Sequence, residues 1–333
     1  MARSPRVVVI TGASAGAGRA AALTFAGQGD RLGLIGRSSR GLDSAREEII
    51  AAGGTAVAHA ADVSDPEALA RAADAIEAEL GPIDVWVNNA MVTVLGPIAE
   101  LKPEEVRRVM EVTFLGAAYG TMIALRRMQA RGRGTIVQVG SALAYRSIPL
   151  QAPYCAAKAA IRAFTDSLRS ELLHERSPIQ ITMVHMPGLN TPQFSWARNK
   201  FRRRQQPVPP IFQPEVAGRA VAFAADHPRR EYWVGLSSVQ AIMGQRVWPG
   251  LLDRMMSSKA WDGQFLDKEI APDRPDNLFN PVEGLHATHG QFDDRAKPRS
   301  PQFWLERYRL MEVGAALLLS VLVAGIVGLL LWL

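Results

Sequence analysis

Three stretches with different compositions follow one another at the start of the chain. Residues 6–10 form a short β-branched run, residues 11–18 read Thr-Gly-Ala-Ser-Ala-Gly-Ala-Gly, and an alanine-rich stretch continues to about residue 27. Glycines between a strand and a helix permit a tight turn and a close approach of a ligand, and the helix N-terminus favours an anionic group. This order predicts a phosphate-binding turn, with an ordinary flexible turn as the alternative. The spacing is Gly-x-x-x-Gly-x-Gly, which differs from the Gly-x-Gly-x-x-Gly of other dinucleotide folds.

The rest of the first 240 residues alternates between strand and helix patterns. Further strands are expected at residues 32–35, 55–59, 83–87, 135–139, 179–185 and 232–235, and helices at residues 44–52, 66–80, 103–129, 153–175 and 214–225. Such alternation predicts an α/β fold, a doubly wound parallel sheet covered by helices on both faces. We expect one domain over residues 1–240, an irregular extension and tether over 241–310, and a membrane helix over 311–333.

The end of the second predicted strand bears on the choice of cofactor. An acidic residue at this place binds the ribose 2′-hydroxyl of NAD, whereas an arginine accommodates the 2′-phosphate of NADP. The chain has Gly36-Arg37 here and no carboxylate before Asp43. This favours NADP over NAD, and a solvated surface arginine is the alternative.

Tyr154 and Lys158 are four residues apart in a predicted helix, so their side chains share one face. A positive charge near a phenol stabilises the phenolate. The pair is therefore suited to proton transfer near neutral pH, with Lys158 lowering the pKa of Tyr154. A tyrosine and a lysine at this spacing are more often surface residues, so the assignment depends on the other motifs.

Taken together, the motifs resemble the short-chain dehydrogenase/reductase family over residues 6–235. The residues that carry the resemblance occur in the family's order: residues 11–18, Asp62-Val63, Asn88-Asn89-Ala90, Ser141, Tyr154, Lys158 and Pro187-Gly188. Ser141 precedes Tyr154 by thirteen residues, which is similar to the family spacing. The resemblance implies a single Rossmann-type domain that transfers hydride between a nicotinamide cofactor and a carbonyl or alcohol.

The resemblance also implies roles for individual residues. Tyr154 would act as general acid in reduction and general base in oxidation, Lys158 would hold the nicotinamide ribose, and Ser141 would hold the substrate oxygen. The other implied cofactor contacts are Gly12, Ser14, Gly16, Gly18, Arg37, Asp62, Val63, Asn88, Ala90, Pro187, Gly188 and Thr191. No metal ligand is implied.

Two positions depart from the family pattern. Thr113 stands where many members have an asparagine that completes a water-linked proton relay with the lysine. A hydroxyl still binds water but lacks the two donors of an amide, so Thr113 is a candidate relay residue with altered geometry. Met91 stands where glycine often follows Asn-Asn-Ala, which would narrow the pocket.

The last 21 residues, 313–333, carry no charge. As a helix they would span about 30 Å, the thickness of the hydrocarbon core of a bilayer. Lys297, Arg299, Arg307 and Arg309 precede this segment, with Trp304 and Tyr308 suited to the membrane interface. They predict a C-terminal anchor with the catalytic domain in the cytoplasm. The single cysteine, Cys155, excludes an internal disulfide framework and fits a reducing compartment.

The remaining candidates are weaker. The net charge of +6 is dispersed apart from the run at residues 198–204, so nucleic acid is not expected as a partner. That run lies where the family has a mobile substrate lid and would contact anionic headgroups or an acidic substrate, or form a solvated loop. His286, His289, Asp293 and Asp294 lie outside a helical frame and are interpreted as a solvated loop rather than a metal site.

We therefore expect a tail-anchored NADP-dependent reductase or dehydrogenase. The pocket residues expected from the sequence are mostly apolar, which with the anchor suggests a lipophilic substrate: Leu143, Ile148, Leu150, Met186, Leu189, Phe194 and Trp196. The alternatives are a membrane-tethered nucleotide-binding scaffold without turnover and an epimerase or isomerase of the same fold. The resemblance also suggests a homodimer or homotetramer built on the helices at residues 103–129 and 153–175.

Overall fold

The computed structural model describes residues 4–271, 274–308 and 314. Within them a seven-stranded parallel sheet has the order β12-β7-β6-β4-β1-β2-β3. Its strands are β1 (Val7–Thr11), β2 (Arg31–Gly36), β3 (Thr55–Ala60), β4 (Val85–Asn88), β6 (Thr135–Ser141), β7 (Gln180–Met186) and β12 (Glu231–Trp233). Because β2 and β3 lie on one side of β1 and the later strands on the other, the winding reverses between β1 and β4. The predicted doubly wound parallel sheet is confirmed, and ligands of such sheets bind where the winding reverses.

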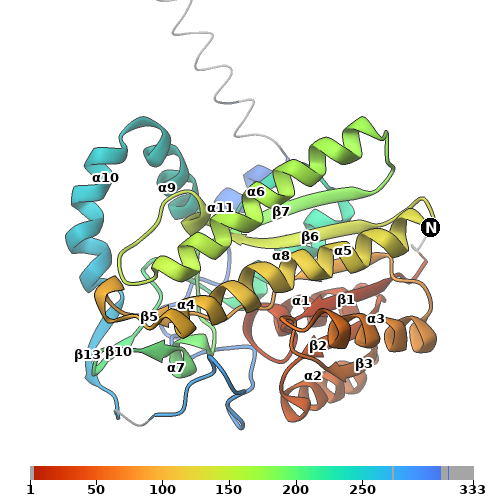
Figure 1. The fold of residues 1–333 in the computed structure, drawn as a ribbon, viewed down its shortest axis with the longest axis horizontal. Coiled ribbons are helices and arrows are strands. Elements are labelled where there is room, and N and C mark those ends of the chain that lie inside the picture. The colour runs from red at the N-terminus through yellow and green to blue at the C-terminus, as the bar shows by residue number, and fades with distance from the viewer. Residues whose placement is uncertain (1–3, 272–273, 309–313, 315–333) are drawn as a thin grey trace, which may run out of the picture.

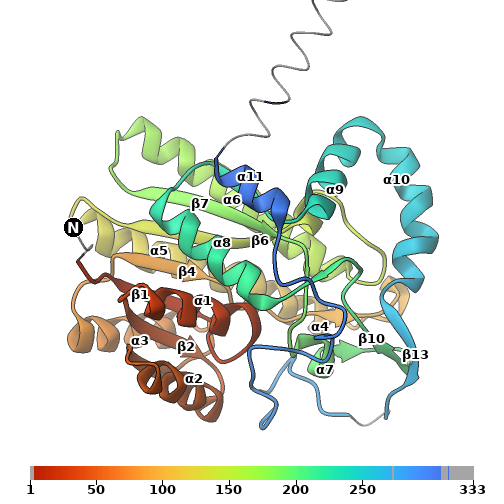
Figure 2. The same ribbon diagram turned by 180° about the vertical axis from the view of Figure 1, so that it is seen from behind.

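Helices cover both faces of this sheet (Figures 1 and 2). One face carries α1 (Gly16–Gly27), α2 (Ser39–Ala51) and α8 (Pro214–Asp226), and the other carries α3 (Pro66–Leu80), α5 (Gly116–Gln129) and α6 (Ala152–His174). Each layer encloses its own apolar cluster, with Phe25 and Ile49 in the first and Ile76 and Leu168 in the second. All five residues of β1 are buried, which explains why its first four residues are all apolar rather than alternating with polar ones.

Two helices differ from the sequence expectation. The helix expected at residues 103–129 is divided into α4 (Pro103–Val109), a π-helical segment at Met110–Leu115, and α5. In this segment the Thr113 hydroxyl exchanges hydrogen bonds of 3.0 and 3.1 Å with the backbone of Val92. Helix α2 begins at Ser39 rather than near residue 44, because Ser38 caps it by accepting a hydrogen bond from the amide of Gly41.

The segment after β12 is more structured than the expected irregular extension. It contains α9 (Leu236–Val247), α10 (Pro249–Met255), a π-helical turn at Met256–Ala260, and β13 (Phe265–Glu269). Strand β13 pairs antiparallel with β10 (Arg203–Gln205). Residues 274–300 have the expected irregular form apart from one bridge between Lys297 and Phe212, and α11 (Pro301–Arg307) follows them. In Figure 1, α9 and α10 project from one end of the body.

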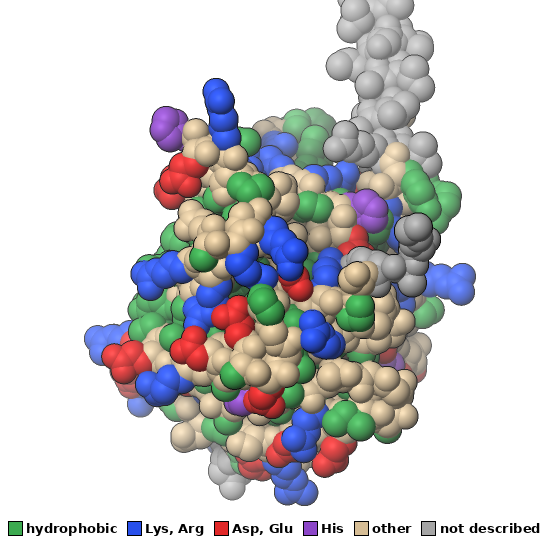
Figure 3. Space-filling model, turned by 90° about the vertical axis from the view of Figure 1, so that its right-hand side faces the viewer, with side chains coloured by type: hydrophobic (Ala, Val, Ile, Leu, Met, Phe, Trp, Pro, Cys, Tyr) green, Lys and Arg blue, Asp and Glu red, His purple; other side chains and the backbone are tan. Residues whose placement is uncertain are grey.

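None of the helices in the described part of the chain is both long and apolar enough to cross a bilayer. The membrane helix expected at residues 311–333 lies outside the described residues, apart from Gly314, and stays a prediction. On the face shown in Figure 3, Lys and Arg side chains are interspersed with Asp and Glu over the residues that are described. The charge on this face is dispersed, as the sequence indicates.

Candidate active site

The glycine-rich turn lies between β1 and α1, at the carboxyl edge of the sheet. Gly12 and Gly16 have φ values of +68° and +56°, a region that favours glycine. A Cβ at Gly12 would lie 2.8 Å from the Cα of Ala90, and one at Gly18 would lie 2.2 Å from the carbonyl oxygen of Gly12. Gly12 and Gly16 therefore shape the turn that faces the cleft, whereas Gly18 allows α1 to pack against the turn.

Arg37 and Asp62 follow β2 and β3, beside the glycine turn. Burial lowers the pKa of the Arg37 guanidinium, and the nearby Asp62 carboxylate opposes this effect. Burial by itself would raise the pKa of Asp62, but hydrogen bonds from Arg108 and Ser64 outweigh it and lower the pKa. Both groups therefore carry charge at neutral pH. The next residue, Val63, is buried in the cluster that lies under α3 and α5.

The two asparagines at the end of β4 face different ways. Asn88 points into the core, where its amide group donates to the Thr121 hydroxyl at 2.9 Å and its oxygen accepts from the indole of Trp86 at 2.8 Å. Asn89 borders the cleft, and its amide group donates to the carbonyls of Thr11 and Gly12 at 3.0 and 3.2 Å. Asn88 therefore does not line the cleft, whereas Asn89 does and ties this loop to the glycine turn.

Ser141, Tyr154 and Lys158 come together at the centre of the carboxyl edge. Ser141 ends β6 and hydrogen-bonds with Tyr154, which lies one turn before Lys158 on α6. The ammonium group of Lys158 donates to the carbonyl of Val139 at 2.6 Å and lies 5.7 Å from the centre of the Tyr154 ring. The three side chains line one cavity.

The pKa of Tyr154 differs from the sequence expectation. Burial raises the pKa of its hydroxyl well above the usual value, and the hydrogen bond with Ser141 opposes this only in part. Burial also lowers the pKa of Lys158 to about 8. In the protein without cofactor the Tyr154 pKa is therefore raised rather than lowered, because desolvation of the phenol dominates and Lys158 is not among the groups that shift it.

The segment after β7 closes the cleft opposite the glycine turn. Pro187 and Gly188 line the cavity, and Thr191 approaches the turn so closely that a Cβ at Gly16 would lie 3.0 Å from its side chain. Thr113, by contrast, is fully buried, its hydroxyl is bonded to Val92, and it does not line the cavity. The structure does not bring Thr113 to the site as a relay residue, because the π-helical turn directs its hydroxyl at the backbone of Val92.

The apolar half of the cavity includes most of the residues expected from the sequence: Leu143, Ile148, Met186, Leu189, Phe194 and Trp196. Leu150 does not line it and instead packs with Leu95 and Phe265. Residues from α9 onward complete the wall and were not anticipated: Ser237, Ser238, Ala241, Leu252 and Met256. No local motif marks them, because they reach the cavity only through the path of the chain after β12.

A second group missed by sequence reasoning lies behind Ser141. The Nδ1 of His185 lies 3.0 Å from the carbonyl oxygen of Ser141, and its Nε2 lies 2.9 Å from the Glu231 carboxylate. The Tyr145 hydroxyl donates to the same carboxylate at 2.5 Å. Burial favours the protonated form of Glu231, but these hydrogen bonds prevail and lower its pKa to about 2. A buried ionic group thus holds the backbone at the end of β6.

The remaining candidates have internal partners. In the basic run, Arg198 and Lys200 both bind the carboxylate of Glu105, at 3.1 and 2.7 Å. His289 lies between Asp293 and Glu215, at 2.7 and 2.6 Å. Cys155 is buried next to Tyr154. The two basic residues are therefore engaged within the protein rather than free to bind an external anion.

The residues present fit a dinucleotide. The cavity has a volume of about 440 Å³, and thirteen of the sixteen predicted site residues line it: Gly12, Ser14, Gly16, Arg37, Asp62, Val63, Ala90, Ser141, Tyr154, Lys158, Pro187, Gly188 and Thr191. It runs from the glycine turn and Arg37, suited to phosphates, to Ser141 and Tyr154, suited to a reacting oxygen. The predicted residues outside it are Asn88, Gly18 and Thr113.

Comparisons with known proteins agree with this geometry. The family described as short chain dehydrogenase matches residues 6–201. An uncharacterised oxidoreductase of Bacillus subtilis, YxnA, is 31% identical over 285 residues, which cover 84% of this chain and 80% of that protein. The putative oxidoreductase SadH of Mycobacterium tuberculosis is 30% identical over 260 residues, 76% of this chain and 94% of SadH.

Solved structures show the same likeness. An alcohol dehydrogenase of Thermococcus sibiricus complexed with 5-hydroxy-NADP has a TM-score of 0.60 at 25% identity, covering 69% of this chain and 95% of that one. A metagenomic short-chain oxidoreductase in complex with NADP has a TM-score of 0.58 at 28% identity, covering 70% of this chain and 97% of that one. With its glycine turn and its Ser-Tyr-Lys group in one cleft, the chain belongs to the short-chain dehydrogenase family.

Proposed function

We propose that the protein is an NADP-dependent oxidoreductase that interconverts a carbonyl and an alcohol on a lipophilic substrate at a membrane surface. The observation that carries the proposal is the convergence of Ser141, Tyr154 and Lys158 on the cavity that the glycine turn and Arg37 also line. A nicotinamide cofactor bound there would supply or accept the hydride.

The chain's own residues handle the proton and the orientation. The Tyr154 hydroxyl, whose pKa is raised by burial, holds its proton at neutral pH and donates it to a developing alkoxide. Ser141 directs a second hydroxyl at the same place and stabilises the oxygen on which charge develops. Lys158 is anchored by the carbonyl of Val139, which fixes its position one helical turn from Tyr154.

The preference for NADP rests on Arg37. It is the cation at the end of β2 that lines the cavity, and β2 ends in Gly36-Arg37 without an acidic residue. An arginine suits a 2′-phosphate, whereas an acid would suit the free 2′-hydroxyl of NAD. The complexes of two structural neighbours with NADP or its 5-hydroxy derivative support the same choice.

The proposal of a lipophilic substrate rests on the helical pair α9–α10. Ala241, Leu252 and Met256 from this region line the cavity, whereas Val247 and Trp248 at its tip are exposed. An apolar wall inside and apolar residues outside suit a substrate that enters from lipid.

The proposed membrane attachment rests on the sequence of residues 313–333 and on α11. Trp304 and Tyr308 are both exposed, five or more residues before this apolar segment. Aromatic residues in such positions favour the membrane interface, and the basic residues nearby favour the cytoplasmic side. Removing residues 311–333 is expected to release the protein from membranes into an alkaline-carbonate wash, whereas the full chain stays in the pellet.

Turnover is tested with purified full-length protein in detergent and NADPH, against panels of small polar and lipophilic carbonyl compounds. We expect oxidation of NADPH with lipophilic ketones, and a kcat about 10²- to 10⁴-fold lower in Tyr154→Phe with NADPH binding retained. Equal rates with both panels would refute the lipophilic substrate. Turnover that survives in Tyr154→Phe would refute the assigned acid.

The route from the membrane is tested in lipid vesicles. Trp248→Ser is expected to raise the KM for a vesicle-dissolved ketone and to leave the KM for a water-soluble ketone unchanged. Ile50→Ser is the matched control, because Ile50 is also an exposed apolar residue, on α2 at a distance from α9 and α10 (Figure 1). The same KM change in both variants would contradict the route.

One observation favours the alternative of a nucleotide-binding scaffold without turnover. Thr113 does not reach the cavity, so the proton relay of the family lacks its usual member at this position. If a cellular role of the protein persists in Tyr154→Phe while NADPH oxidation is lost, the scaffold is the better description.

A further inference from the structure

Residues 274–290, here called the cofactor strap, cross the cleft beside the glycine turn. They form no helix or strand, yet they contact Arg37 just after β2, residues of α1 and α4, and the segment after β7. Asn277, Pro281, Val282 and His286 of the strap line the same cavity as the candidate active site. The strap is therefore part of the cofactor cleft rather than a distant tether.

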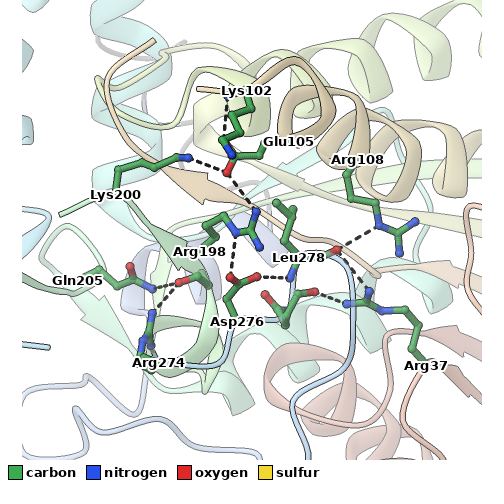
Figure 4. Close-up of polar contacts among 12 residues, drawn as sticks. Arg37, Lys102, Glu105, Arg108, Arg198, Lys200, Gln205, Arg274, Asp276 and Leu278 are labelled. Atoms are coloured by element: carbon green, nitrogen blue, oxygen red, sulfur yellow. Dashed lines mark hydrogen bonds and ion pairs between the residues drawn. The ribbon is translucent and has the colours of Figure 1, made fainter. Parts of the chain in front are cut away.

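The strap first engages Arg37, the residue proposed to bind the 2′-phosphate. The Arg37 guanidinium donates to three successive backbone carbonyls, those of Asn277, Leu278 at 3.4 Å and Phe279 at 3.0 Å. Figure 4 shows Arg37 beside Leu278. These neutral oxygens stand where a phosphate would supply charged ones. The arginine can satisfy one set or the other, because its donors form one rigid fork.

The strap also engages the residues expected to meet the adenine ring. Arg108 binds the Asp62 carboxylate and donates to the Leu278 carbonyl at 3.1 Å. The Leu278 side chain is 0% exposed and belongs to the buried cluster that contains Val63. The apolar Leu278 side chain thus supplies the packing contact that the face of the adenine ring would supply.

A third set of contacts covers the phosphate-binding turn. The Gly16 amide, one of the donors expected to face a pyrophosphate, donates to the Ala287 carbonyl at 2.9 Å. Next to Arg37, the Ser38 hydroxyl donates to the Glu283 carboxylate at 3.1 Å. Carbonyl and carboxylate oxygens of the strap thus occupy donors that phosphate oxygens would use.

From these contacts we propose that the cofactor strap is an internal competitor for the adenosine end of NADP, which must be displaced before the cofactor binds. The proposal rests on the proposed NADP site. Each displaced contact has a counterpart in the cofactor: the phosphate oxygens replace the carbonyls and Glu283, and the adenine ring replaces Leu278. Charge-assisted bonds from Arg37 to phosphate are stronger than bonds to neutral carbonyls, which favours the exchange.

The strap is fastened at a point outside the cofactor contacts. Asp276 accepts a hydrogen bond from Arg198 at 2.8 Å, and Arg198 also binds Glu105 at 3.1 Å (Figure 4). Arg274 donates to the carbonyls of Ser195 and Ala197. Substitutions here weaken the strap without changing a group proposed to touch NADP.

The test measures NADPH binding to the full-length protein in detergent by fluorescence, at equilibrium and by stopped flow. The apparent Kd equals the intrinsic Kd divided by the fraction of protein with the strap open. Loss of a partly buried ion pair therefore predicts an apparent Kd roughly three- to fivefold lower in Asp276→Asn, with faster association. Arg274→Met should likewise lower the apparent Kd and speed up association. Asp74→Asn on α3, which removes an ion pair with Arg127 of α5, is the matched control and should bind like the wild type.

Hydrogen exchange supplies a second readout that does not depend on the variants. Peptides within residues 274–290 should exchange faster when NADP⁺ is saturating, because the Asn277 amide then loses its bond to the Trp196 carbonyl. Slower exchange with NADP⁺, or an unchanged or weaker affinity in both Asp276→Asn and Arg274→Met, would overturn the strap as a competitor while leaving the cofactor assignment intact. No NADPH binding by the wild type or either strap variant would instead overturn the proposed function, and the strap proposal with it.

Discussion

Lys158 offers a quantitative test of the site, because the protein keeps an amine in a place where its charge is unfavourable. Its side chain is 2% exposed, and its ammonium group donates to the carbonyl of Val139. Burial lowers its pKa from 10.5 to about 8. Each pH unit corresponds to about 1.4 kcal/mol, so below pH 8 the charged amine destabilises the folded protein by about 3 kcal/mol.

The sign of the pH dependence follows from the two pKa values. Between pH 8 and 10.5 the unfolded chain holds the Lys158 proton more tightly than the folded protein does, so the free energy of unfolding rises with pH. The rise due to Lys158 is about 2 kcal/mol between about pH 7.5 and about pH 9.5. In Lys158→Met this part of the rise disappears. The variant should therefore lose its advantage over the wild type as the pH increases.

The assay is urea unfolding of the cofactor-free protein in detergent at both pH values, for the wild type and Lys158→Met. The difference between the proteins in free energy of unfolding isolates Lys158, since all other groups titrate in both. Lys259→Met, at an exposed lysine, is the control and should follow the wild type. If Lys158→Met shows the same rise as the wild type, the amine is not desolvated in the folded protein and the argument from burial fails.

Three further predictions concern other parts of the site. Arg37→Ala should reduce the preference for NADP over NAD by about 10- to 100-fold without weakening NAD binding, measured by fluorescence titration with both reduced cofactors; an unchanged preference would exclude Arg37 from the phosphate site. Because the pKa of Glu231 is lowered to about 2, its bonds with Tyr145 and His185 stabilise the fold above pH 4.5, and this stability is lost as the pH falls towards 2. Glu231→Gln should therefore be less stable at neutral pH and show a smaller loss on acidification in thermal melts, and equal losses would contradict this. Gly12→Ala should lower the Tm by a few degrees and weaken NADPH binding, because its φ of +68° and a backbone atom 2.8 Å from the new Cβ both oppose a side chain; wild-type behaviour would show that the turn can relax.

Much of the fold and the reacting group could be predicted because the signals are local. The glycine turn is recognisable from its place between an apolar strand and a helix, and Tyr154 and Lys158 from their spacing on one helix. The parallel sheet covered on both faces follows from strands alternating with helices, since crossovers in such sheets have a fixed hand. These features depend on a few neighbouring residues, which a sequence shows directly.

The sequence predictions failed where the direction of a side chain or the path of the chain determines which residues reach the site. Asn88 and Asn89 are adjacent at a strand end, and a difference of one residue sends a side chain to the core or to the cleft. Thr113 is directed at Val92 by a π-helical turn that no sequence period announces. His185 and Glu231 meet across β7 and β12, so neither appears next to a motif.

The residues after β12 explain why the family resemblance alone is an incomplete guide to this site. Met256 and Leu252 wall the substrate side of the cavity, whereas Asn277 and His286 lie on the cofactor side, fewer than 40 residues apart in the chain. The chain then returns to α11, where Phe303 joins the cluster under α1 and α8. A single segment therefore contacts the substrate wall, the cofactor cleft and the core before it reaches the apolar tail. Because these contacts share one backbone, we expect displacement of α9–α10 to affect the cofactor strap, so that the membrane attachment proposed above would change cofactor affinity as well as substrate access.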